Sequence, residues 1–229
     1  KISKFVFSCA HSKSFLRNNK LRGALSYIEW GEAQVSVKGA SHTVAGIPWP
    51  EVNSVSTNKP YWYSVRLKKP GHFVVPALIR ERFFYAQNRH RLFDTNMFYH
   101  GTFDDEKDVA LSCAILNSTI TYFVTEVYGR LNIGGRLNLY GTEYLQLPIL
   151  SPKKVDILSI NKILEAYDAL SIKNVMPITE EIKKEERKAL DMEIIKGFNL
   201  HKAVSIEVIY ESLCEMVFKR IQRETSEGN

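Results

Sequence analysis

The chain has 229 residues, of which 45% are hydrophobic and 24% charged, and it carries a formal net charge of +6 at pH 7. This composition is that of a soluble globular protein and excludes an intrinsically disordered chain. The three cysteines, Cys9, Cys113 and Cys214, are far apart and form no CxxC pair, which argues against a disulfide framework or a zinc knuckle. We therefore expect a reducing, cytoplasmic setting.

The first half of the chain is rich in short runs typical of strands. The runs contain β-branched and aromatic residues and are separated by Gly, Pro and Asn. They are "SKFVFS" (3–8), "AQVSVKG" (33–39), "YWYSVRL" (61–67) and "HFVVPALI" (72–79). We expect an α+β fold in which residues 1–151 form a mainly β domain with one embedded helix.

The embedded helix is predicted over Val109 to Tyr128. The acidic run "FDDEKD" (103–108) favours a helix N-terminus, and Gly129 favours its end. Because apolar residues cover most of its circumference and polar residues such as Asn117 and Glu126 interrupt it, the segment is expected to be a buried helix and not a membrane span. The N-terminal residues lack the apolar core of a secretory signal. Since the chain begins at Lys1, we also expect a fragment of a longer protein.

A change to helical periodicity occurs at about Pro152, and residues 152–229 are predicted to form a helical extension of about three helices. The first carries apolar residues from Val155 to Leu170. The second is expected to begin with Thr179 as N-cap and to run to about Lys196, and the third to begin at about Ser205.

Basic residues are concentrated in the first part of the chain. Residues 1–151 hold 18 Lys and Arg against 11 Asp and Glu, whereas residues 152–229 hold 13 against 14. Between Lys59 and Arg91 the only acidic residue is Glu81, and aromatic residues are interleaved with the basic ones. Basic side chains neutralise phosphates and aromatic rings stack on bases, so the segment suits nucleic acid. The alternative is a β core whose charges form a solvated face.

Motifs for chemistry are weak. The segment "GRLNIGGRLNLYGTEYLQLPIL" (129–150) lacks the GK[ST] of a phosphate-binding loop, and "NKPY" (58–61) departs from the Asn-Pro-Pro-aromatic motif of adenine methyltransferases. Asp104, Asp105 and Glu106 are either helix-capping residues or the metal ligands of a small nuclease. The six histidines show no HxxxH spacing. We therefore expect no catalytic residue and no metal or cofactor site in this chain.

One stretch resembles a known family. The run from Ile115 to Leu150 resembles the segment that closes the target recognition domain of N6-adenine DNA methyltransferases and of their fused restriction-modification relatives, the Type IIG enzymes. A helix opening on Leu-Asn-Ser, a Gly-containing loop and a strand ending in Leu-Pro-Ile carry the resemblance. The matching residues are Leu116, Asn117 and Ser118, then Gly134 and Gly135, then Leu147, Pro148 and Ile149.

Further segments extend the resemblance to about Lys59–Arg220. Upstream, "YWYSVR" (61–66), "VPALIRERFFYAQN" (75–88) and "LFDTNMFYHG" (92–101) resemble strands of the family. Downstream, Arg187, Leu190 and Asp191 match its Arg-x-x-Leu-Asp helix, and Gly197 and Leu200 match the break that follows. Residues 1–58 match only loosely.

The resemblance implies a division of labour. This chain would be the specificity domain of a restriction-modification system, with double-stranded DNA as its partner. A catalytic domain elsewhere in the parent chain would bind S-adenosylmethionine and methylate the chosen site, with or without an endonuclease activity. The predicted DNA contacts are Arg66, Lys68, Lys69, Arg80, Arg82, Arg89, Arg91, Arg130, Asn132, Arg136 and Asn138. The rival interpretations are a helical docking module of a restriction-modification complex and the small metal-dependent nuclease.

Overall fold

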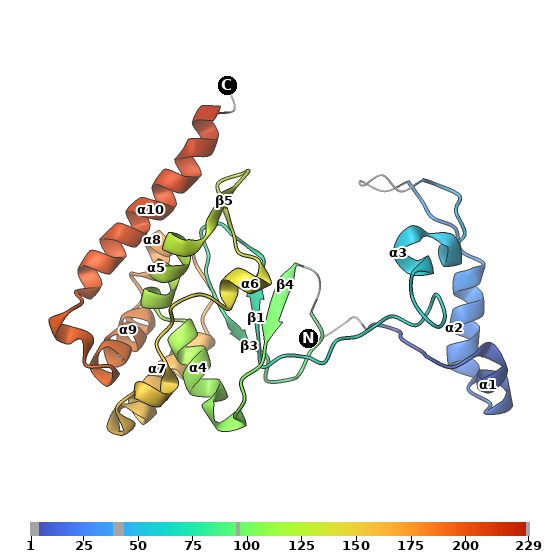
Figure 1. The fold of residues 1–229 in the computed structure, drawn as a ribbon, viewed down its shortest axis with the longest axis horizontal. Coiled ribbons are helices and arrows are strands. Elements are labelled where there is room, and N and C mark those ends of the chain that lie inside the picture. Colours follow the sequence, from blue (N-terminus) through green and yellow to red (C-terminus); the bar gives the residue numbers. More distant parts are fainter. Residues whose placement is uncertain (1–4, 39–43, 95–96, 228–229) are drawn as a thin grey trace. The chain divides into compact units, whose positions relative to one another are not determined.

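The computed structural model describes residues 5–38, 44–94 and 97–227, with side chains to residue 222. The chain forms two compact units, Lys1–Lys69 and Pro70–Asn229 (Figure 1). The predicted boundary between residues 151 and 152 lies inside the second unit. The physical reason is that the helices after Pro152 bury their apolar faces in the same cores as the strands and helices before it.

The first unit is built on short helices. These are α1 (Lys13–Asn18), α2 (Arg22–Glu32), a 3-10 turn η1 (Trp49–Glu51) and α3 (Asn53–Ser56). Ser12 caps α1 by accepting a hydrogen bond from the N–H of Phe15 at 3.1 Å. The buried side chains of Leu16, Ile28 and Tyr63 form its core.

The strands predicted in this unit are not found among its described residues. Residues 5–8 and 61–67 have no strand, and Val35 makes only an isolated bridge with Pro48. The aromatic residues that suggested strands pack instead against α1 and α2, as Tyr63 does. Residues 3, 4 and 39 of the predicted strands lie outside the described residues.

The second unit contains two antiparallel sheets of three strands each. The orders are β3-β1-β4 and β2-β6-β5. The strands are β1 (Phe73–Pro76), β2 (Leu78–Ile79), β3 (Ala86–Gln87), β4 (Phe98–Gly101), β5 (Arg130–Asn132) and β6 (Arg136–Asn138). The run "HFVVPALI" was therefore predicted correctly as extended, although its two strands, β1 and β2, belong to different sheets.

Helices outweigh strands in the described chain, at 49% against 9% of the residues. The helices of the second unit are α4 (Val109–Leu116), α5 (Thr119–Tyr128), α6 (Gly141–Tyr144), α7 (Ile160–Ser171), α8 (Ile178–Glu181), α9 (Glu185–Gly197) and α10 (Ile206–Glu227), with 3-10 turns η2 (Glu106–Asp108), η3 (Pro152–Lys154), η4 (Ile157–Ser159) and η5 (Leu200–Lys202). The α+β class is confirmed, but the expectation of a mainly β domain is wrong. Many apolar residues assigned to strands pack on helices and pair with no other strand.

The predicted embedded helix is two helices, α4 and α5. Asn117 ends α4, and Ser118 takes an extended conformation and caps α5 by accepting from the N–H of Thr121 at 3.2 Å. A Ser side chain that bonds to backbone competes with helix continuation, which explains the break. Gly129 ends α5 as expected, and α4 is almost entirely buried.

The C-terminal helices differ from the prediction in two places. The first helix, α7, begins at Ile160, so Val155 and Leu158 lie before it, after η3 and within η4. The second expected helix is divided into α8 and α9, with Pro177 and not Thr179 at the N-cap of α8. The third begins as expected, and the Oγ of Ser205 accepts from the N–H of Val208 at 3.4 Å. In Figure 1, α10 packs along α5, and α7 packs on α9.

Within the described part of the chain, no single helix is long and apolar enough to cross a membrane. The pair Glu106–Leu116 and Thr119–Tyr128 meets the criteria of length and composition only across a bend of 72°.

Candidate nucleic-acid interface

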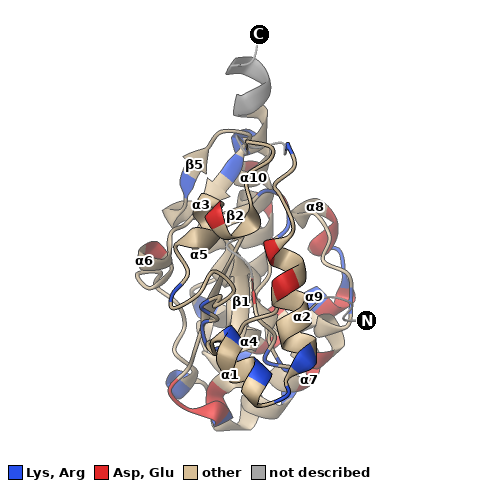
Figure 2. Cartoon of the chain, turned by 90° about the vertical axis from the view of Figure 1, so that its right-hand side faces the viewer, with Lys and Arg blue, Asp and Glu red and all other residues tan. Residues whose placement is uncertain are grey.

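A two-stranded ribbon, β5–β6, brings together four of the predicted DNA contacts. Arg130 lies opposite Asn138, and Asn132 opposite Arg136. Side chains at directly opposed positions of an antiparallel pair point to the same face, and alternate residues point to the other. Arg130, Asn132, Arg136 and Asn138 therefore share one face of the ribbon. Figure 2 shows basic residues on this ribbon beside the β5 label.

The opposite face of the ribbon is directed to the protein core at β6, whereas Leu131 of β5 is 53% exposed on that face. Leu137 is 2% exposed, and the Ile79 beside it in β2 is 1% exposed. Gly129 allows this packing, because a Cβ there would lie 2.4 Å from the Cγ of Leu137. Burial of Leu137 fixes the register of the two strands, since a shift by one residue would exchange the two faces of the ribbon. The polar face is consequently held towards solvent.

The turn of the ribbon is made by Ile133, Gly134 and Gly135. Both glycines have positive φ, at 86° and 57°, a conformation that other residues adopt only with strain. The Gly-containing loop that the resemblance implies is thus the turn that joins β5 to β6, and the buried helix α5 already ends before β5. Ile133 precedes the glycines and its side chain is 91% exposed.

The four polar side chains of the ribbon are not equally available. Arg136 and Asn132 are exposed, and Asn138 is half-buried. The Nε of Arg130 lies 2.5 Å from Oε1 of Glu143, whose carboxylate also accepts from the N–H of Tyr140. Arg136 has no ion-pair partner among the described residues. It is therefore the cation of this face most available to a ligand.

The arginines between β2 and β4 are exposed, but most are held by acidic side chains. Arg89 pairs with Asp168 at 2.6 Å, and Arg91 pairs with Glu106. Arg80 lies 3.9 Å from Glu81, whereas Arg82 forms no ion pair with any described residue. Of these four arginines, Arg82 is thus the one that has no ion-paired carboxylate among the described residues to compete with a ligand.

Arg66, Lys68 and Lys69 lie in the first unit. They are exposed in a segment without regular secondary structure, residues 64–70, and not on the predicted strand. Their part in DNA binding stays a prediction.

The acidic run does not assemble a metal site. The side chain of Asp105 accepts from the N–H of Lys107 at 2.9 Å and so caps η2, and Glu106 pairs with Arg91 and lies 3.4 Å from Nε2 of His72. Among the described residues, no group of three or more His, Cys, Asp or Glu side chains is placed to hold a metal ion. The geometry agrees with the capping interpretation of these carboxylates.

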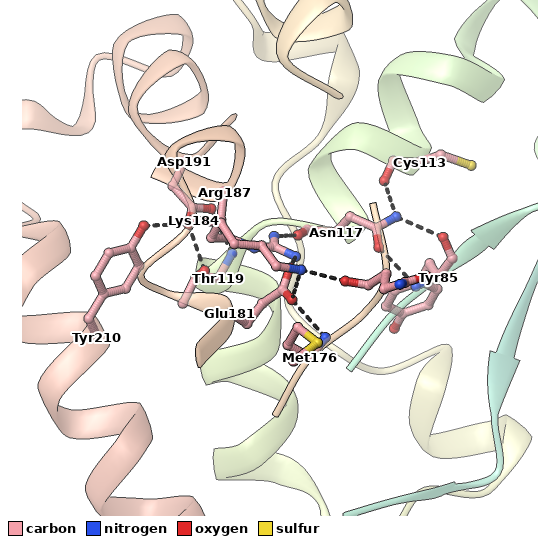
Figure 3. Close-up of polar contacts among 11 residues, drawn as sticks. Tyr85, Cys113, Asn117, Thr119, Met176, Glu181, Lys184, Arg187, Asp191 and Tyr210 are labelled. Atoms are coloured by element: carbon pink, nitrogen blue, oxygen red, sulfur yellow. Dashed lines mark hydrogen bonds and ion pairs between the residues drawn. The ribbon is translucent and has the colours of Figure 1, made fainter. Parts of the chain in front are cut away.

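A buried polar network surrounds the break between α4 and α5 (Figure 3). The side chain of Asn117 pairs with the backbone of Tyr85 in both directions, accepting from its N–H at 3.0 Å and donating to its carbonyl at 2.7 Å. Arg187 donates to the carbonyl of Asn117 and to Oε1 of Glu181. Asp191 accepts from the N–H of Thr119 at 2.8 Å and from its hydroxyl at 2.6 Å.

This network gives a structural role to two of the motifs that carry the family resemblance. The Leu-Asn-Ser motif at 116–118 and the Arg-x-x-Leu-Asp motif at 187–191 are about 70 residues apart in sequence and are joined by these hydrogen bonds. Both are buried. They fix α9 to the break between α4 and α5, and they do not line the ribbon face.

A second buried contact anchors the ribbon. Arg220 of α10 forms a bidentate pair with Glu126 of α5, with Nε 2.5 Å from Oε1 and Nη2 3.1 Å from Oε2. It also donates to the carbonyl of Gly135 in the turn and to that of Arg80 at 2.6 Å. The sequence prediction missed this pair. The sequence does contain a sign of this pair. Arg220 follows Leu213 by seven residues and Val217 by three, which places a charged residue on the apolar face of the predicted helix.

Comparison of the chain with protein-family models, curated proteins and solved structures finds no match. The resemblance to target recognition domains therefore stays a prediction.

Glu181 is expected to make stability dependent on acid pH. Burial raises the pKa of its carboxyl, but hydrogen bonds from Lys184 and from the N–H of Met176, with the charge of Arg187, bring the pKa below its ordinary 4.5. A carboxyl with a lowered folded-state pKa stabilises the protein above the unfolded-state pKa, and this contribution is lost as pH falls through the folded-state pKa. Glu181→Gln is expected to cost about 1.5 to 3 kcal/mol at pH 7.

The measurement is urea unfolding of wild type and Glu181→Gln from pH 7 to about pH 3, where the difference between them should shrink below about pH 4.5. Glu185→Gln is the matched control, because Glu185 pairs with Lys188 on the exposed side of α9. It is expected to have little effect at any pH. If the difference in free energy of unfolding between wild type and Glu181→Gln stayed constant with pH, the lowered pKa of Glu181 would be contradicted.

Proposed function

We propose that this chain recognises double-stranded DNA in a sequence-specific manner, with the polar face of the β5–β6 ribbon in the major groove. The observation that carries the proposal is the shared face of Arg130, Asn132, Arg136 and Asn138. The major groove admits a two-stranded β-ribbon, Arg binds guanine through O6 and N7, and Asn binds adenine through N6 and N7. The ribbon therefore places Arg and Asn side chains at strand spacing, with Arg136 and Asn132 exposed for base contacts, Arg130 paired with Glu143 and Asn138 half-buried.

Charge supports the same proposal. Residues 127–140, which contain the whole ribbon, include two arginines and no acidic residue. Arg82 and the basic segment with Arg66, Lys68 and Lys69 supply exposed cations for phosphates, which add affinity without sequence information. A domain that selects DNA needs both kinds of contact.

The role in a parent protein rests on the resemblance. A target recognition domain of an N6-adenine methyltransferase would present a site to a catalytic domain that binds S-adenosylmethionine. The rival docking function has less support, because Ile163, Leu190 and Leu213 of α7, α9 and α10 are fully buried inside the unit, although Val208 and Phe218 of α10 are exposed.

The test of the proposal is selection from a pool of duplexes with a randomised central segment, using the full chain at low salt. An enriched sequence, bound more tightly than unselected duplex in fluorescence anisotropy, is the expected result. Specific complexes are typically at least about a thousandfold tighter than non-specific ones. Absence of duplex binding at low salt would overturn the proposal, and binding without enrichment would remove sequence recognition from it.

Arg136→Ala is expected to weaken binding to the selected duplex by about 5- to 150-fold, because one good base contact is worth about 1 to 3 kcal/mol. Binding to unselected duplex should change much less. The charge-matched control is Lys162→Ala, since Lys162 is exposed on α7. An equal loss on both duplexes would assign Arg136 to a phosphate, and an unchanged affinity on both would remove it from the interface.

A further inference from the structure

The tip of the ribbon carries an apolar side chain that the hydrogen-bonding face does not explain. Ile133 is 91% exposed and Leu131 of the same ribbon 53%, whereas Leu137, which lies opposite Leu131, is buried. Exposure of a branched aliphatic side chain at the end of a turn costs free energy in water, since apolar surface is best removed from it. The side chain is thus available for an apolar partner.

The surroundings of Ile133 favour a nucleic acid as that partner. Asn132 precedes it, Gly134 and Gly135 follow it, and Arg130 and Arg136 flank the turn on the two strands. Without a side chain, Gly134 allows a phosphate backbone to approach the turn closely, whereas Gly135 is buried. A docking surface for another protein domain would more often be a broad apolar patch than the two exposed aliphatic side chains of this ribbon, Leu131 and Ile133.

Buried hydrogen bonds hold the turn that carries Ile133. Arg220 donates to the carbonyl of Gly135, and its guanidinium is held in turn by the buried carboxylate of Glu126. Below the turn, the register fixed by Leu137 prevents the strands from sliding. A side chain that separates two stacked base pairs must resist the stacking free energy, so a rigid mount is what this task requires.

We propose that Ile133 is a wedge that inserts between adjacent base pairs of the bound duplex and unstacks them. Proteins that insert single Ile, Leu, Phe or Met side chains into a base step kink the duplex and open it locally. This inference rests on the proposed DNA binding and deepens it, because it assigns distortion of the duplex to one residue and sequence reading to its neighbours. A base that is already unstacked takes less free energy to extrude.

The experiment uses the full chain and the selected duplex with 2-aminopurine placed at each adenine position in turn. Wild type is expected to raise the fluorescence at one or two adjacent positions, because unstacking relieves quenching. Ile133→Ala should abolish the rise, and Ile133→Leu should keep it. Leu145→Ala is the control, since Leu145 is 88% exposed but lies outside the ribbon, and it should leave the rise intact.

Binding measured in parallel separates this inference from the proposed function. Ile133→Ala should retain the slope of log affinity against log salt, which reports phosphate contacts. DNA binding without any fluorescence rise, or a rise that persists in Ile133→Ala, would overturn the wedge and leave DNA recognition standing. Absence of DNA binding by wild type would overturn both. Loss of association with a methyltransferase domain in Ile133→Ala, with the fluorescence rise unchanged, would assign the tip to a protein contact instead.

Discussion

Replacing Arg220 by Met is expected to lower the free energy of unfolding by about 3 to 5 kcal/mol, because the carboxylate of Glu126 would be left buried without a counter-charge. The side chains of Arg220 and Glu126 are 6% and 3% exposed, so water cannot take the place of the guanidinium. The carbonyls of Gly135 and Arg80 would also lose their donor. Urea unfolding followed by circular dichroism measures the loss.

The controls separate charge from packing. The double variant Arg220→Met, Glu126→Gln removes the unpaired charge and should recover part of the stability, since a buried ion pair and an uncharged pair of similar volume are often close in stability. Lys219→Met is the matched surface variant, because Lys219 pairs with Glu215 on the exposed side of α10. It should change stability little. An Arg220→Met variant as stable as wild type would show that the pair does not support the fold.

Asp191→Ala should be comparably damaging, at about 3 to 5 kcal/mol. Asp191 has no exposed surface, and it accepts from the N–H and hydroxyl of Thr119 and from the hydroxyl of Tyr210 at 2.8 Å. Removal of the carboxyl would leave these donors buried without an acceptor, and each such donor costs about 1 to 3 kcal/mol. Thermal and urea unfolding should both report the loss.

Asp191→Asn is the control for Asp191→Ala, because the amide oxygen retains an acceptor for Thr119. Burial raises the pKa of the Asp191 carboxyl, against the lowering influence of Arg187, Thr119 and Tyr210. A raised folded-state pKa means that wild-type stability falls as pH rises from the ordinary Asp value of 3.8 through the folded-state pKa. Asn has no proton to lose there, so the advantage of wild type over Asp191→Asn should narrow with rising pH. If the difference in free energy of unfolding between wild type and Asp191→Asn widened with rising pH, the pKa of Asp191 would be lowered in the folded state and not raised.

Arg220→Met and Asp191→Ala affect different parts of the second unit. Arg220 supports the ribbon turn directly, so Arg220→Met should also loosen the mount of Ile133. Asp191 fixes α9 to the start of α5 and touches no residue of the ribbon face. Two of the motifs that carry the family resemblance, at 116–118 and 187–191, thus hold α9 to the break between α4 and α5. On the ribbon face, Arg136 and Asn132 are exposed, and Arg136 has no ion-pair partner among the described residues.

The amino-acid sequence by itself determined the features that depend on neighbours within a few residues. Gly134 and Gly135 allow the turn, Gly129 ends α5, and Ser205 caps α10, because backbone conformation and capping are decided within about four residues. The helical periodicity after Pro152 likewise depends on side chains one turn apart. These features and the α+β class held, whereas Thr179 does not cap the second C-terminal helix, which is divided into α8 and α9.

Only the tertiary structure decided which distant residues meet. Runs such as "YWYSVRL" have strand composition, but Tyr63 finds its lowest free energy against Leu16 and Ile28, so packing overrides local preference. The pairing of Arg130 with Asn138 follows from burial of Leu137 on the other face, and no pattern in the sequence states that register. Arg220 reaches Glu126 across 94 residues, a contact that exists only once α5 and α10 are packed. For the same reason, the boundary between the units lies after Lys69 and not at Pro152, since the C-terminal helices complete the core around α4 and α5.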